Sequence, residues 1–182
     1  KGIFSKVIRN FYKSYTRYKS NDLPYVASKL AVSKDFFSNK KKKKWLTNKY
    51  SRGRVHLMRK NHDCILTSIK TVVSDNPRLT CRIKGLEKNS PSRIILDKNL
   101  EISLQSEVIK SALKYKTIIF YNNTNNKKID ILKKHKVILH KMPLDENYNF
   151  NLRNILMKIK SIGFSRIFLE AGANLNYEFF KK

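Results

Sequence analysis

Glu170 and the small residues after it form the segment of this sequence with the clearest chemical potential. The apolar run at 167–169 ends in Glu170, and Ala171-Gly172-Ala173 leads into a helix-like segment. This pattern predicts a buried strand that enters a helix N-terminus through a tight turn, where backbone N–H groups can meet a phosphate. Two plainer interpretations stay open: the turn only joins strand to helix, or Glu170 only caps that helix.

Lys29 and Asp75 are the other residues whose position calls for an explanation. Lys29 interrupts the apolar alternation of residues 25–33, which predicts a strand. Burial of an ammonium group is costly, so Lys29 either reaches a functional site or lies on a solvated edge. Asp75 stands before Asn76 and Pro77, which predicts an Asx turn, although the same carboxylate can also bind a ligand.

Composition excludes several classes of protein. The chain has 182 residues and is 41% hydrophobic, enough for a domain with a packed core. Its net charge of +27 would suit a nucleic-acid partner, but the lysines are spread along the chain, which favours compositional drift and makes nucleic acid an unexpected partner. No apolar run approaches the roughly 20 residues of a transmembrane helix. Cys64 and Cys81 lack metal-site spacing and are expected in the core.

The elements that must position these residues alternate between strands and helices, which predicts an α/β domain with an at least partly parallel sheet. Residues 1–23 are basic and are interpreted as a linker, with a mitochondrial transit peptide as the alternative. The expected strands are 25–33, 64–67, 93–96, 117–121, 137–140 and 167–169. The expected helices are 48–61 with Thr47 as N-cap, a turn capped by Ser68, 129–135, and 152–159 followed by Gly163.

Five segments in order carry a resemblance to a known family: YVASKLAVSKD, KKWLT, RKNHDCILTSIKTVVSDNPRLTCR, SRIILD and IFLEAGANL. They are similar to the reductase domain of the bifunctional riboflavin-biosynthesis protein RibD, over essentially the whole chain. The resemblance implies an α/β, three-layer, dihydrofolate-reductase-like fold with a mixed, mainly parallel sheet flanked by helices. It also implies that 1–23 is a linker from an upstream deaminase domain that is absent here, and that 24–182 is a reductase domain lacking the family's last strands.

The resemblance implies an activity as well. Members of the family reduce the ribosyl group of 5-amino-6-(5-phosphoribosylamino)uracil to the ribityl group, with NADPH as hydride donor. A phosphorylated pyrimidine substrate, a possible homodimer and a cytoplasmic location follow, with no membrane and no metal. A basic RNA- or ribosome-associated binding protein without catalytic activity is the alternative, and a folate-type reductase would share the fold class but not the paired DNPRLTCR and EAGANL motifs.

The family's functional positions map onto individual residues of this chain. Lys29, Asp75 and Glu170 would act at the reacting centre. The residues that would bind the cofactor are Ala31, Trp45, Thr71, Asp75, Lys98, Gly172, Ala173, Asn174 and Leu175. Those that would bind the substrate are Lys43, Arg59, Leu79, Arg82 and Glu170, with arginine suited to a phosphate because its planar fork donates two hydrogen bonds. Phe36, Lys43 and Asn76 depart from the family pattern, and whether these departures weaken activity stays open.

Overall fold

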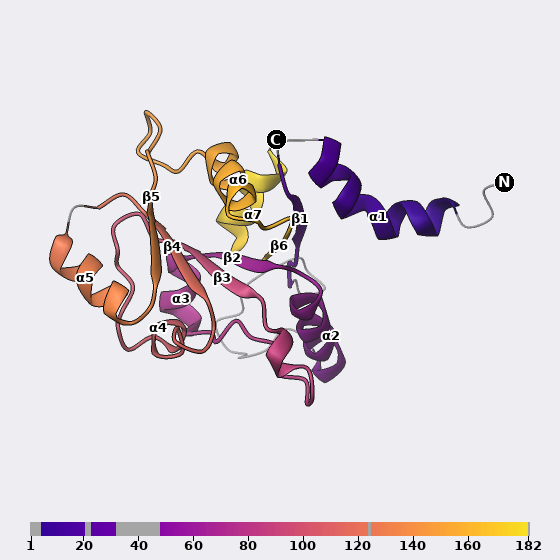
Figure 1. Ribbon diagram of the computed structural model, residues 1–182, viewed down its shortest axis with the longest axis horizontal. Coiled ribbons are helices and arrows are strands. Elements are labelled where there is room, and N and C mark those ends of the chain that lie inside the picture. Colours follow the sequence, from indigo (N-terminus) through magenta and orange to yellow (C-terminus); the bar gives the residue numbers. More distant parts are fainter. Residues whose placement is uncertain (1–4, 21–22, 32–47, 124, 182) are drawn as a thin grey trace.

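The computed structural model describes residues 5–20, 23–31, 48–123 and 125–181. Six strands form one sheet in the order β1-β6-β2-β3-β4-β5 (Figure 1). The strands are β1 (Tyr25–Ser28), β2 (Cys64–Ser68), β3 (Ser92–Leu96), β4 (Thr117–Tyr121), β5 (Ile138–Lys141) and β6 (Arg166–Leu169). The helices are α1 (Ser5–Ser20), α2 (Lys49–Lys60), α3 (Ile69–Asp75), α4 (Glu107–Lys110), α5 (Asn126–Lys134), α6 (Leu152–Ser161) and α7 (Ala173–Phe180), with a 3-10 turn, η1, at Glu87–Asn89.

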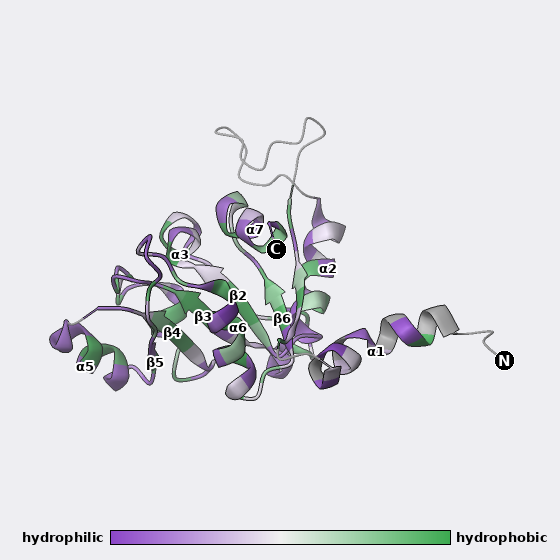
Figure 2. Ribbon diagram, turned by 90° about the horizontal axis from the view of Figure 1, so that it is seen from above, coloured by the Kyte–Doolittle hydropathy of each residue, from purple (hydrophilic) through white to green (hydrophobic). Residues whose placement is uncertain are grey.

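The α/β class and the mainly parallel sheet are confirmed, since every neighbouring pair of these six strands runs parallel. A parallel sheet is covered on both faces, and its central strands are therefore apolar along their whole length. Strands β2, β3 and β4 follow this rule, with nearly every residue buried, whereas the edge strands β1 and β5 are only partly buried. Figure 2 shows this as hydrophobic strands enclosed by largely hydrophilic helices.

A layer of helices covers each face of the sheet (Figure 1). One face packs against α2, α3, α4 and α5, and the other packs against α6 and α7. Burial of one large aliphatic side chain contributes about 1.5–3 kcal/mol, so these two clusters account for much of the stability. The first cluster includes Ile65, Val72, Ile95, Val108, Ile129 and Phe168, and the second includes Leu66, Ile94, Phe120, Ile155, Ile159 and Leu169.

Several elements differ from the sequence expectations: α4 was not expected, and α5 begins at Asn126 rather than at 129. Strand β1 ends at Ser28 because its partner β6 ends at Leu169, the register partner of Ser28. Helix α2 begins at Lys49, with the Asn48 side chain accepting from the Ser51 N–H as its N-cap; the expected cap, Thr47, lies outside the described residues. Residues 5–20, expected as a linker, form the helix α1, which projects from the body of the molecule (Figure 1).

The other expectations about local structure hold. Ser68 caps α3 through its hydroxyl, and the helix continues to Asp75 before Asn76 ends it in the left-handed conformation. Both cysteines are buried and free, and burial raises the pKa of the Cys64 thiol far above its usual range. In the part of the chain that the structure describes, no helix combines the length and the apolar character needed to cross a bilayer.

Arg93, in the middle of the sheet, is fully buried and holds several loops together. Its guanidinium donates to the backbone carbonyls of Arg78, Val108 and Tyr115 and to the hydroxyls of Thr117 and Ser111. Burial lowers the pKa of Arg93 to about 10. Because the Arg78 carbonyl belongs to the loop that carries Arg82, this buried arginine also fixes a segment of the candidate site described below.

We expect Arg93→Met to lower the free energy of unfolding by at least about 3 kcal/mol, because each buried acceptor left without a donor costs about 1–3 kcal/mol. Urea unfolding followed by circular dichroism measures the change. Arg153→Met, an exposed arginine on α6, is the matched control and should change stability by less than about 0.5 kcal/mol. A loss below about 1 kcal/mol in Arg93→Met would show that water replaces these hydrogen bonds.

Candidate active site at the carboxyl edge of the sheet

The carboxyl ends of β1, β6 and β2 bring three polar residues into one row. Ser28 pairs with Leu169, and Leu169 pairs with Leu66, so the next residues along these strands are Lys29, Glu170 and Thr67. The Lys29 N–H donates to the Leu169 carbonyl at 3.1 Å, and the Glu170 N–H donates to the Leu66 carbonyl at 3.0 Å. Lys29 therefore stands at the end of its strand, next to Glu170, and not in mid-strand.

Alternation along the strands places these three side chains on one face of the sheet. Ala27, Phe168 and Ile65, two positions earlier on each strand, all belong to the cluster beneath α2 and α3, and side chains two apart share a face. Glu170 follows this rule, since it contacts α2. The Thr67 hydroxyl is fully buried and has no hydrogen-bond partner among the described residues.

A buried ion pair between Arg59 and Glu170 is the central feature of the site. The Arg59 Nε donates to Glu170 Oε1 at 2.6 Å and its Nη2 donates to Oε2 at 2.9 Å. The side chains are 10% and 13% exposed. The remaining Arg59 nitrogen, Nη1, donates to the Thr80 carbonyl at 2.9 Å. Each of the three Arg59 nitrogens thus donates to a protein group, and Arg59 holds the Glu170 carboxylate in a fixed bidentate geometry.

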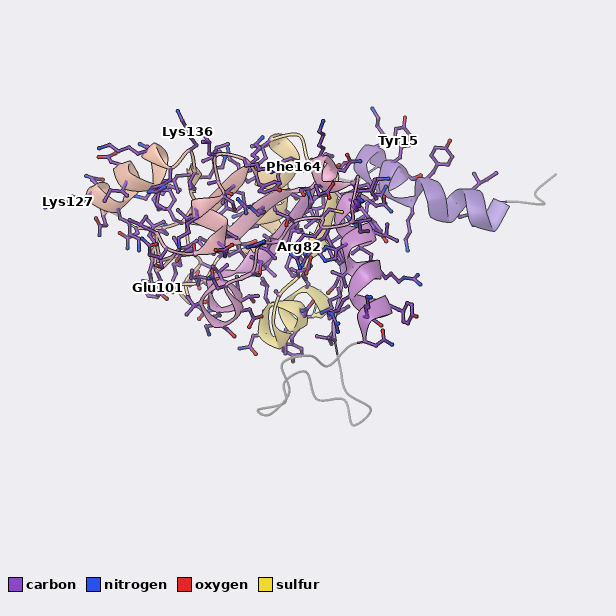
Figure 3. All side chains as sticks on the ribbon, turned by 90° about the horizontal axis from the view of Figure 1, so that it is seen from below. Tyr15, Arg82, Glu101, Lys127, Lys136 and Phe164 are labelled. Atoms are coloured by element: carbon purple, nitrogen blue, oxygen red, sulfur yellow. The ribbon has the colours of Figure 1, made fainter. Side chains whose placement is uncertain are left out.

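Arg82 lies beside this pair with its guanidinium open to solvent. Figure 3 shows Arg82 in the middle of the molecule, whereas the labelled Lys127 and Lys136 lie at one end. Partial burial and the nearby charges of Arg59 and Arg78 lower the pKa of Arg82, opposed by Glu170. In the described part of the chain, the Arg82 side chain forms no ion pair, so its planar fork is available for an anionic ligand.

His56, on α2, contacts the backbone of the segment that carries Arg82. Its Nδ1 lies 3.1 Å from the Thr80 carbonyl and 3.3 Å from the Arg82 amide nitrogen. Partial burial, followed by the charges of Arg59 and Arg82, lowers the pKa of His56. Depending on the tautomer, Nδ1 either donates to the Thr80 carbonyl or accepts from the Arg82 N–H.

The turn after Glu170 is open, as the sequence predicted. Gly172 is the N-cap of α7, and a Cβ built on it meets no atom within 4 Å. Gly172, Ala173 and Asn174 are exposed. The N–H groups of Gly172 and Ala173 have no acceptor in the described residues. The start of α7 can therefore receive a phosphate, because the helix N-terminus presents unpaired donors and partial positive charge.

Several other predicted residues lie away from this ion pair. Asp75 is exposed at the end of α3, where its carboxylate accepts from the Ser74 hydroxyl, and no hydrogen bond or ion pair among the described residues joins it to Lys29 or Glu170. Leu79 is 2% exposed and belongs to the first core cluster. It also has a φ of 53°, a left-handed conformation that is rare for leucine and shapes the turn before Arg82.

Of the remaining predicted residues, some lie in described segments and others lie outside the described residues. The Thr71 hydroxyl lies 3.3 Å from that of Ser68. The Lys98 Nζ donates to the Tyr148 carbonyl at 2.8 Å. Ala31 lies just beyond β1, while Trp45, Lys43 and Phe36 lie outside the described residues.

The sequence reasoning did not single out three residues that the structure places in the site: His56, Thr80 and Asn176. His56 could have been found, because it precedes Arg59 by three positions and so shares its helix face. Asn176 interrupts the apolar side of α7, where it is 2% exposed. Thr80 acts through its backbone carbonyl, for which a sequence carries no signal.

A parallel sheet with a fixed carboxylate and an open helix N-terminus at its carboxyl edge is the arrangement that α/β domains use to bind phosphate-bearing ligands. Comparison with known proteins gives the family. Residues 24–182 match the family described as the RibD C-terminal domain. The chain therefore belongs to the RibD C-terminal domain family.

Individual relatives agree with this assignment. The Aquifex aeolicus riboflavin biosynthesis protein RibD is 30% identical over 184 residues, covering 100% of this chain and 49% of that protein. A Buchnera aphidicola protein named 5-amino-6-(5-phosphoribosylamino)uracil reductase is 28% identical over 151 residues, covering 73% of this chain and 66% of that protein. The chain spans about half the length of the RibD proteins it matches.

Solved structures show the same fold. Acinetobacter baumannii RibD superposes with a TM-score of 0.81 at 21% identity, covering 99% of this chain and 48% of that one. The Saccharomyces cerevisiae riboflavin biosynthesis reductase superposes with a TM-score of 0.69 at 22% identity, covering 92% of this chain and 73% of that one. The expected dihydrofolate-reductase-like architecture is confirmed.

Proposed function

We propose that this chain is an NADPH-dependent reductase that converts the ribosyl group of 5-amino-6-(5-phosphoribosylamino)uracil to the ribityl group in riboflavin biosynthesis. The family and the names of the relatives support this reaction. The observation that carries it is the Glu170 carboxylate, fixed by Arg59 directly before the open Gly172 turn. A fixed acidic group and a phosphate-binding turn lie side by side, as a site that aligns a nicotinamide with a sugar requires.

The residues present fit a dinucleotide. The space in front of Gly172 and the unpaired N–H groups at the start of α7 suit a pyrophosphate. Ala31, Thr71 and Asp75 stay candidates for the rest of the cofactor, as do Asn174 and Leu175. Lys98 would have to exchange its bond to the Tyr148 carbonyl for one to the 2′-phosphate of NADPH. When bound, NADPH supplies the hydride, and the protein supplies orientation and electrostatics.

Each residue of the site then has a distinct task. Glu170 can accept hydrogen bonds from ribosyl hydroxyl groups, and Arg59 keeps its carboxylate oriented. Lys29, next to Glu170 on β1, can neutralise or protonate the substrate atom that gains an electron pair when the sugar C1 is reduced. Because Arg59 is buried against Glu170 and the Thr80 carbonyl, we assign the substrate phosphate to Arg82, whose guanidinium has no ion-pair partner among the described residues.

A direct assay tests the proposal with the full 182-residue chain. The chain is incubated with the phosphoribosylaminouracil and NADPH, and oxidation of NADPH is followed by absorbance. Lys29→Met should lower kcat with little change in NADPH affinity, whereas Lys60→Met, an exposed lysine on α2, should leave both unchanged. If wild-type protein shows neither turnover nor NADPH binding but binds RNA with a steep salt dependence, the non-catalytic alternative is correct.

Arg82→Ala should raise the KM for the phosphorylated substrate by a factor equivalent to about 1.5–3 kcal/mol, the usual range for a hydrogen bond to a charged group. NADPH affinity should stay the same, because the Gly172 turn is untouched. Steady-state kinetics and fluorescence titration measure the two quantities. Arg78→Ala is the matched control, since Arg78 lies in the same loop but pairs with Glu107. A loss of NADPH affinity with unchanged KM would mean that the two ends of the site are reversed.

A further inference from the structure

Asn176 joins two parts of the site that are far apart in the sequence. Its side chain is almost fully buried in the first half of α7. The Nδ2 amide donates to the Ala171 carbonyl at 2.7 Å and to the Gly172 carbonyl at 3.1 Å. Its Oδ1 accepts from the hydroxyl of Ser28, the last residue of β1. The hydrogen-bonding capacity of this amide is thus largely used to hold the turn that follows Glu170.

The partners of Asn176 fix which way the amide faces. Carbonyl oxygens can only accept, so the NH₂ group must face Ala171 and Gly172, and the oxygen must face the Ser28 hydroxyl. A flipped amide would set its oxygen against two carbonyl oxygens. The two carbonyls therefore fix the orientation of the amide, and the Ser28 hydroxyl, which can donate or accept, donates to its Oδ1.

This arrangement also sets the direction of the two peptide N–H groups in the turn. In a trans peptide, the C=O and the following N–H point in opposite directions, and the described residues contain no cis peptide. The Asn176 side chain holds the carbonyls of Ala171 and Gly172 inward, and the Gly172 carbonyl also accepts from the Asn176 backbone N–H at 3.3 Å. The N–H groups of Gly172 and Ala173 therefore point outward. These are the N–H groups without an acceptor in the described residues, and a Cβ built on Gly172 itself meets no atom within 4 Å.

We propose that Asn176 is the positioning residue of the cofactor site: through Ser28 it orients the Gly172 and Ala173 N–H groups toward the cofactor pyrophosphate. This role rests on the proposed function. Because Ser28 directly precedes Lys29, the same contact keeps the α7 turn in register with the end of β1. Asn176 thereby couples the position of the phosphate-binding turn to the position of the lysine at the reacting centre.

Two measurements on the full chain test this role. In the ligand-free protein, Asn176→Ala should increase amide hydrogen exchange in residues 170–175, because the turn loses its two side-chain donors. Its Kd for NADPH should rise about tenfold, the equivalent of one lost interaction of 1.4 kcal/mol. The Kd for reduced nicotinamide mononucleotide, which lacks the pyrophosphate bridge, should stay within a factor of about two, a split that general destabilisation would not produce.

Substitutions at Ser28 test the same contact from its other side. Ser28→Ala should weaken NADPH binding less than Asn176→Ala does, and Ser28→Thr, which keeps the hydroxyl, should restore it. The double variant Ser28→Ala with Asn176→Ala should bind no more weakly than Asn176→Ala alone, because both changes disable the same contact. Asn154→Ala, an exposed asparagine on α6, is the matched control and should alter neither measurement.

The outcomes separate this role from the proposed function. Unchanged hydrogen exchange in Asn176→Ala, or unchanged NADPH affinity in a wild type that binds NADPH, would overturn the positioning role. If the wild type binds neither NADPH nor the mononucleotide, the proposed function fails. Faster exchange in Asn176→Ala would then still show that Asn176 holds the turn, but its role toward a pyrophosphate would be refuted.

Discussion

Gly172→Val is expected to abolish NADPH binding while leaving the domain folded. The position has a φ of −66° and a ψ of 174°, an extended conformation that any residue adopts, and a Cβ there meets no protein atom within 4 Å. The branched side chain would instead fill the space in front of the outward-facing N–H groups. Any loss of binding would therefore come from a clash with the ligand and not from strain in the protein.

Fluorescence titration with NADPH and urea unfolding measure the two effects of Gly172→Val. The free energy of unfolding should fall by no more than about 1 kcal/mol, because glycine is a better N-cap than valine. Gly172→Ala, with a single methyl group, should give an intermediate affinity. If Gly172→Val binds NADPH as well as the wild type does, the turn only connects β6 to α7, and the cofactor lies elsewhere.

Arg59→Met is expected to lose both activity and stability. Removal of one partner of a buried ion pair costs about 3–5 kcal/mol, because the other charge is left buried without compensation. Glu170 would be that charge, at 13% exposure. The substitution also removes the donor to the Thr80 carbonyl, so the segment that carries Arg82 would loosen. We expect kcat/KM to fall together with the free energy of unfolding.

A double variant separates these two effects. Arg59→Met combined with Glu170→Gln removes both charges, and neutral replacement of a buried pair is often tolerated. Stability should then recover to within about 2 kcal/mol of the wild type, the remaining loss being the Thr80 carbonyl, while activity should not recover. If turnover does recover, Glu170 and Arg59 form a structural pair only, and the reacting centre must be sought around Lys29 and Arg82.

The sequence by itself was sufficient for the buried central strands and for the turn at Glu170. Apolar runs of four or five residues, as at 64–67 and 117–121, predict buried parallel strands because both faces of such a sheet are covered. The Glu170 to Ala173 pattern predicted the open helix N-terminus because its cause is local: a carboxylate at a strand end, a residue without a side chain, and the start of a helix. The Ser68 cap of α3 was predictable for the same reason.

Only the tertiary structure decided which charges meet. The sequence suggested Arg59 and Arg82 equally as phosphate ligands, but the fold buries Arg59 against Glu170, 111 positions away, and leaves Arg82 open to solvent. Strand β1 could not be delimited from its own residues, because its length is set by the point at which β6 ends. Pairing in a parallel sheet joins segments distant in sequence, so local patterns cannot give its register.

Asn176 also shows the difference between what the sequence determines and what only the fold decides. From the sequence it is one polar residue in a helix, whereas in the fold its amide binds Ser28 and the turn at Gly172. The sequence determined the class of domain and the strand–turn–helix order at Glu170, because these depend on local propensity and apolar patterning. Other features depend on how β1, β6, α2 and α7 pack together: the ion pair of Glu170 with Arg59, the exposure of Arg82, and the hydrogen bonds of Asn176. Only the folded chain brings those segments into contact.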